Sequence, residues 1–126
     1  MLSSELQETL RRSVDMAVSL RHEFLVLEHL LLAMLDDPRA VEILDAAGVD
    51  QTILRDQLSE FLNESVTSIP EGSDNEPQQT LTFQRVIQRA AMHMRSSGRD
   101  SIDAGNLLVS MFREPESYAV YLLEQQ

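Results

Sequence analysis

The sequence predicts an all-α domain, a pseudo-two-fold double repeat of about seven or eight short helices that share one core. Three blocks carry this prediction, because each occurs twice and in the same order. The three pairs are LRRSVDMA (10–17) with FQRVIQRA (83–90), EHLLLAMLDDP (28–38) with GNLLVSMFREP (105–115), and AVEILD (40–45) with AVYLLE (119–124). A helical unit this short cannot bury its apolar face alone, so the two copies are expected to pack together.

The first two predicted helices differ in how much of their surface is apolar. A helix over residues 3–20 is amphipathic, because apolar residues recur at helical spacing: Leu2, Leu6, Leu10, Val14, Ala17 and Val18. A helix over residues 27–35 contains the run LLLAML and is apolar on most sides. We therefore expect the second helix to be central and buried.

Punctuating residues define the next two helices. Pro38 fits the start of a third helix, which Gly48 ends. Asp50 is a suitable N-cap for a fourth helix over residues 51–62. These four helices make up the first repeat, residues 1–63.

Residues 64–80, with the sequence ESVTSIPEGSDNEPQQT, have a different composition. They contain four acids, no basic residue, two prolines and one glycine. Their apolar content is too low to form a core, so they are predicted to be a solvated linker between the repeats.

The second repeat, residues 81–126, begins with a fifth helix that is expected to run to about residue 95. Thr82 is the predicted N-cap of this helix. Leu81 and Val86 have the spacing of a hydrophobic staple around that cap.

Two more helices complete the second repeat. Asp103 is the predicted N-cap of a sixth helix over residues 104–112, and a seventh is expected to begin near Pro115. The chain stops at Gln126, where the first repeat would supply Gly48 and a further helix. We therefore expect one domain over the whole chain, with a truncated second repeat.

The composition excludes several classes of function. The net charge of −11 opposes binding to nucleic acid and to anionic membrane surfaces. All ten basic residues are arginine, so a complete P-loop and Schiff-base chemistry through a lysine side chain are excluded. The absence of cysteine excludes thiol catalysis and disulfides, and fits a cytoplasmic location.

The histidines do not form a compact metal motif. His22 and His29 are separated by a loop, and the segment HEFLV is not HExxH, because Val26 replaces the second histidine. His29 beside the leucine run is expected to be a hydrogen-bonded structural residue. No nucleophile with an orienting histidine, oxyanion loop or glycine-rich phosphate cradle can be recognised, so we expect neither a metal site nor an enzyme.

Four strings across the chain carry a family resemblance. They are RHEF (21–24), EHLLLA (28–33), TFQRVIQRA (82–90) and SSGR (96–99). With them, the whole chain resembles the N-terminal double-repeat domain of the Clp/Hsp100 ATPase unfoldases. ClpC-type and ClpB-type domains usually carry a Gly-Thr-Glu-His form of the second string, whereas this chain has LVLEH and IDAGN, which favours the ClpA type.

The resemblance implies a docking module that is tethered above the ATPase ring of a parent unfoldase. It implies binding of a ClpS-type adaptor, which delivers N-end-rule substrates to the ClpAP protease, and contact with some protein substrates. ClpP would be reached through the rest of the parent ATPase, and ATP hydrolysis would belong to other modules. We expect this fragment to be monomeric and to have no cofactor.

The resemblance also places the adaptor-binding site on His22, Glu23, Glu28, Thr80 and Arg85. Glu23 and Glu28 are expected to form an acidic patch that faces a basic adaptor surface, with the other three at its edge. Simpler interpretations remain open. A carboxylate is favoured at a helix N-terminus, as Glu28 would be, Thr80 fits a loop residue, and Arg85 fits a solvated helix face.

One departure from the family pattern concerns Val26, which stands where many relatives have Thr or Ser. Valine cannot cap the second helix, and such a loss costs about 1 kcal/mol. Three other functions remain as alternatives: a ClpC-like or ClpB-like domain serving other adaptors or aggregates, a helical metal-dependent hydrolase, and a free-standing acidic regulatory protein.

Overall fold

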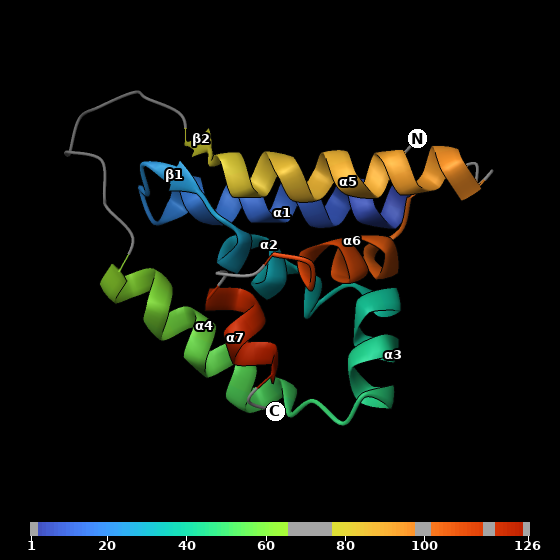
Figure 1. The fold of residues 1–126 in the computed structure, drawn as a ribbon. Coiled ribbons are helices and arrows are strands. Elements are labelled where there is room, and N and C mark those ends of the chain that lie inside the picture. The colour runs from blue at the N-terminus through green and yellow to red at the C-terminus, as the bar shows by residue number, and fades with distance from the viewer. Residues whose placement is uncertain (1–2, 66–76, 98–101, 115–117, 125–126) are drawn as a thin grey trace.

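The computed structural model describes residues 3–65, 77–97, 102–114 and 118–124 (Figure 1). The described residues confirm the all-α prediction, apart from two strands of two residues each. The elements in chain order are α1 (Ser4–Ser19), β1 (Phe24–Leu25), α2 (Leu27–Met34), α3 (Pro38–Ala46), α4 (Gln51–Ser65), β2 (Gln78–Gln79), α5 (Leu81–Ser97), α6 (Ala104–Met111) and α7 (Tyr118–Glu124).

Helix α2 is the centre of the core, as its apolar surface predicts. All eight of its residues are buried. It packs against α1, α4 and α7, so one helix of the first repeat contacts helices from both halves. Figure 1 shows α2 between the α1–α5 layer and the α4–α7 layer. The single core shared by two repeats follows from this position.

Aspartate caps define three of the helix starts, and the sequence predicts two of them, Asp50 and Asp103. Asp37 precedes Pro38 and accepts hydrogen bonds from the backbone N–H of Arg39 and of Ala40 at the start of α3. Asp50 accepts a hydrogen bond from the N–H of Ile53 in α4. Asp103 accepts one from the N–H of Asn106 in α6, at 3.0 Å. Each acceptor satisfies an N–H that has no partner within its helix.

The predicted linker over residues 64–80 is wrong at both ends. Helix α4 continues through Ser65, and Gln78 and Gln79 form β2, which pairs in parallel with β1. Residues 66–76 of the predicted linker lie outside the described residues. The polar composition did not reveal the strand, because backbone groups alone make this pairing: the N–H of Gln78 donates to the carbonyl of Glu23 at 3.0 Å.

The start of α5 also differs from the prediction. Thr80, not Thr82, is the N-cap, because its Oγ1 accepts a hydrogen bond from the N–H of Phe83 at 3.2 Å. The predicted hydrophobic staple is therefore wrong, and Leu81 is 78% exposed. Because α5 begins at Leu81, Phe83 belongs to its first turn, and its side chain lies in the core at 2% exposure.

The two repeats meet directly where α3 packs against α6. Gly105 eases this approach, because a Cβ at that position would lie 2.7 Å from Cδ1 of Ile43, which would then have to shift. In the described ranges, no helix combines the length and the apolar character that are needed to cross a bilayer.

Candidate functional site

The parallel strands bring together two segments that are far apart in the sequence. The N–H of Thr80 donates to the carbonyl of Leu25 at 3.2 Å, just after Gln78 binds the carbonyl of Glu23. Three candidate residues, His22, Glu23 and Thr80, therefore flank one small sheet, and Glu28 follows β1 in the first turn of α2.

The turn after α1 directs His22 into the molecule. Arg21 has a positive φ of 56°, the left-handed conformation that commonly ends helices. The N–H of Arg21 donates to the carbonyl of Val18, and the N–H of His22 donates to the carbonyl of Ala17. These two bonds form a Schellman motif, with arginine at the position usually held by glycine. The chain then reverses, and the His22 side chain is 3% exposed.

A chain of hydrogen bonds fixes both buried histidines in single tautomers. The N–H of Val26 donates to Nδ1 of His29 at 3.0 Å, so this Nδ1 carries no proton. In neutral His29 the proton is on Nε2, which donates to Nδ1 of His22 at 2.8 Å. His22 in turn hydrogen-bonds the backbone of Leu62 in α4. The prediction that His29 is a hydrogen-bonded structural residue is confirmed.

This arrangement also compensates for Val26. As predicted, α2 has no side-chain cap at Val26. Instead, His29 reaches back to the N–H of the cap residue and holds the end of β1 against α2. The loop that carries Glu23 is thereby fixed from inside the domain.

The histidines contribute no charge to this surface at neutral pH. Burial lowers the pKa of His29 to about 4, and the repulsion that a protonated His22 would exert on a second charged ring adds to this shift. Burial also lowers the pKa of His22, although its hydrogen bond to the Leu62 backbone opposes this shift. His22 therefore shapes the loop and does not present a cation to solvent.

The predicted acidic patch of Glu23 and Glu28 is wrong, because Glu28 is buried. Glu23 is exposed, but Glu28 is only 7% exposed, so these residues do not form two solvent-facing carboxylates. Burial raises the pKa of Glu28 to about 7, and a hydrogen bond with its own backbone N–H only partly opposes this. Burial occurs because Glu28 lies in the first turn of α2, around which α1, α4 and α7 pack.

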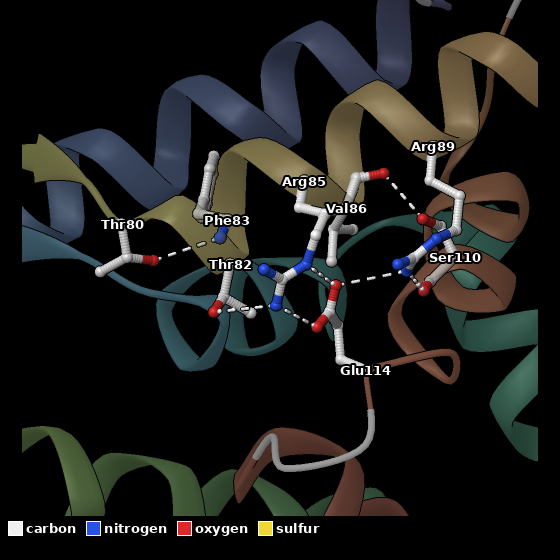
Figure 2. Close-up of polar contacts among 8 residues, drawn as sticks. All are labelled: Thr80, Thr82, Phe83, Arg85, Val86, Arg89, Ser110 and Glu114. Atoms are coloured by element: carbon white, nitrogen blue, oxygen red, sulfur yellow. Dashed lines mark hydrogen bonds and ion pairs between the residues drawn. The ribbon is translucent and has the colours of Figure 1, made fainter.

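Arg85 lies one turn beyond Thr80 and turns toward α6 (Figure 2). Its Nε and Nη2 bind the two carboxylate oxygens of Glu114 at 2.9 and 2.6 Å. Arg89 Nη1 lies 3.3 Å from the same carboxylate and donates to the carbonyl of Ser110 at 3.0 Å. Arg85 is thus joined to the end of α6 and not to Glu23.

Sequence reasoning missed Glu114, although the repeat contains a signal for it. In both copies, a carboxylate precedes a proline at the end of the repeated leucine block, as Asp37 and as Glu114. Both are buried, at 1% and 2% exposure. Asp37 accepts a hydrogen bond from the hydroxyl of Thr9 at 2.7 Å, so each acid ties the end of its block to the preceding long helix.

The described site offers an apolar surface for binding. Exposed apolar side chains missed by sequence reasoning surround the strands: Leu20 at 39%, Phe24 at 38% and Leu81 at 78% exposure. Among the residues that the structure describes, no group of three or more His, Asp or Glu side chains could hold a metal ion.

Comparisons with known proteins agree on one family. The model for "Clp repeat (R) N-terminal domain" matches residues 1–126. A "ClpA homolog protein" from Fuscovulum blasticum is 44% identical over 98% of this chain, which spans 16% of that relative's length.

Solved structures share the fold at low sequence identity. The Hsp104 N-terminal domain from Candida albicans has a TM-score of 0.84 at 10% identity, covering 98% of this chain and 80% of that one. A complex of the ClpV N-domain with a VipB peptide has a TM-score of 0.76 at 16% identity, covering 98% of this chain and 77% of that one.

Proposed function

We propose that this chain, which belongs to the Clp repeat N-terminal domain family, is a non-catalytic docking module for protein partners of a cytoplasmic Clp/Hsp100 ATPase. One observation carries the proposal. Parallel pairing of β1 with β2 holds two distant segments side by side, so that Glu23, Phe24 and Leu81 are exposed on a buried, hydrogen-bonded foundation. Apolar groups beside a charge on a preorganised surface are suited to binding a protein.

The partner that we propose is a ClpS-type adaptor, bound one to one by the monomeric domain for delivery of N-end-rule substrates to ClpP. The 44% identity to a ClpA homologue supports this choice. Glu23 would meet a cationic group of the adaptor. His22, Glu28 and Thr80 would hold the backbone in place, and Arg85 would form the edge nearest α6.

A second candidate is direct binding of peptides or of other adaptors, as in a ClpC-like or ClpB-like domain. It is favoured by the common fold with the ClpV N-domain, which was captured with a VipB peptide. The two candidates differ in what should bind to the β1–β2 surface: a folded adaptor or an extended peptide.

Isothermal titration with purified ClpS tests the proposal. We expect one site per domain, and at least tenfold weaker binding after Glu23→Arg, because charge reversal leaves the partner cation facing another cation. Glu60→Arg on α4 is the matched control, since Glu60 is exposed and the change in net charge is the same. Absence of ClpS binding by the wild-type domain, with retained binding of a VipB peptide, would favour the second candidate.

A further inference from the structure

We propose a second docking site on the face between α5 and α6, for an acidic protein segment that presents an apolar side chain between carboxylates. We call this the α5–α6 face and define it by Arg85, Arg89, Met92, Val109 and Arg113. It goes beyond the adaptor proposal, because it uses none of the residues of the paired strands and shares only Arg85 with the adaptor candidates.

The α5–α6 face is hollowed. A pocket of about 190 Å³ lies between the two helices and is lined by Arg89, Val109 and Arg113 among others. A second, shallower hollow of about 480 Å³ follows α5 past Arg85 and Met92. Both hollows include Arg89, His93 and Arg113, so they form one continuous depression.

The charge of this depression is opposite to that of the chain. Among the described residues of the depression, three guanidinium groups and the carboxylate of Glu114 leave a local charge of +2, within a chain of net charge −11. At an ionic strength of 0.15 M the Debye length is about 8 Å, so the lining arginines dominate the field inside the depression. A carboxylate that enters it is therefore attracted.

Glu114 positions two of these cations and neutralises only part of their charge. Its side chain is 2% exposed, whereas the side chains of Arg85 and Arg89 are 54% and 31% exposed. Hydrogen bonds from Arg85 lower the pKa of Glu114, so the Glu114 carboxylate stays ionised. From its buried position it binds the guanidinium groups of Arg85 and Arg89. A guanidinium has five N–H donors, so Arg85 can bind a second carboxylate on its outer side.

Apolar side chains in the same depression select a protein segment over a polyphosphate. Met92 is 67% exposed and Val109 is 57% exposed, on neighbouring helices. They offer contact to a leucine or phenylalanine between two acidic residues. Nucleic acid is disfavoured, since it would meet the strong net negative charge without gaining from these apolar contacts.

Fluorescence anisotropy with a labelled peptide tests this site. The probe carries a Leu-Phe pair with two Glu residues on each side, and its counterpart has Gln in place of every Glu. We expect the acidic probe to bind the wild-type domain, and to bind at least tenfold more weakly to Arg113→Glu. Arg113 is exposed, and none of the described residues forms an ion pair with it, so the fold should be unchanged; circular dichroism checks this.

Arg55→Glu is the matched control. Arg55 is also exposed, pairs with Asp36 on a different surface, and its reversal changes the net charge equally. Equal weakening by both variants would reduce the effect to net charge and overturn the proposal. Equal binding of the Gln peptide, or stronger competition by an oligouridine RNA than by unlabelled acidic peptide, would also overturn it. Glu23→Arg should leave probe binding unchanged, which separates this site from the adaptor site.

Discussion

Nε2 of His29 lies 2.8 Å from Nδ1 of His22. Backbone partners fix the position of the proton between them, because the N–H of Val26 donates to Nδ1 of His29 and His22 hydrogen-bonds the backbone of Leu62. Adding a proton to either ring breaks this order. A proton on Nδ1 of His29 would face the backbone N–H of Val26. A proton on Nδ1 of His22 would face the ring Nε2–H of His29. Two neutral imidazoles are therefore a condition of the native loop.

We expect the contribution of His29 to the free energy of unfolding to fall as the pH drops below 6.5. The pKa of His29 falls from 6.5 to about 4 on folding, so in that interval the unfolded chain binds a proton that the folded chain does not. The contribution of His29 is complete above pH 6.5 and is lost toward pH 4, for a total of roughly 3 kcal/mol. NMR titration of the His29 ring in the native and urea-unfolded chain measures it directly. A native ring that titrates near 6.5 would contradict this expectation.

Glu28 should act in the opposite direction. Burial raises its pKa from 4.5 to about 7, so the folded chain keeps a proton that the unfolded chain has lost, and stability decreases as the pH rises between these values. The free energy of unfolding of Glu28→Gln minus that of the wild type should therefore be higher at pH 8 than at pH 4.5, by up to roughly 3 kcal/mol. Urea unfolding at both pH values tests this. Glu23→Gln, at an exposed site, should show little difference between them.

Truncation in either repeated leucine block should destabilise the domain. Leu31 and Leu108 are 0% and 2% exposed, so replacement of either by alanine removes packing and leaves a cavity, at a cost of about 2–5 kcal/mol. Leu81→Ala removes the same atoms from a side chain that is 78% exposed, and should cost less than about 0.5 kcal/mol. The comparison uses denaturant midpoints with unchanged slopes. Similar losses at all three positions would refute the shared core.

Removal of the Glu114 charge should loosen α5 from the end of α6. Glu114→Gln weakens two charge-assisted bonds from Arg85 and the contact with Arg89, and we expect a loss of about 1–3 kcal/mol, since the arginine side is partly solvent-screened. A double-mutant cycle with Arg85→Met isolates the pair. Arg11→Met, which removes exposed ion pairs with Glu8 and Asp15, provides the control and should cost less than Glu114→Gln. Additive effects of Glu114→Gln and Arg85→Met would show that the pair is not coupled.

Local signals in the sequence predicted most of the helices. Pro38 and the aspartate caps Asp50 and Asp103 act within one turn, so their effect can be read from neighbouring residues. The repeat itself predicted the shared core. The resemblance brought His22, Glu23 and Thr80 together, and the structure does place them around one sheet.

The remaining features depend on contacts that are distant in sequence. The pairing of Phe24 with Gln78 uses backbone groups alone, and two-residue strands are too short to show an alternating pattern. Thr80 and Thr82 are equally good caps by residue type, and the preceding strand decides between them. The burial of Glu28 could not be predicted either, because it depends on how the helices around α2 pack.

Gly105 limits how freely the two repeated blocks can replace each other. It occupies the place that Glu28 has in the first copy, and there even a methyl group would collide with Ile43. A small side chain at this position would require Ile43 to shift, and the larger glutamate of the first block would require more room between α3 and α6. A chimera with the first block in both places should therefore keep its helices but push α3 and α6 apart.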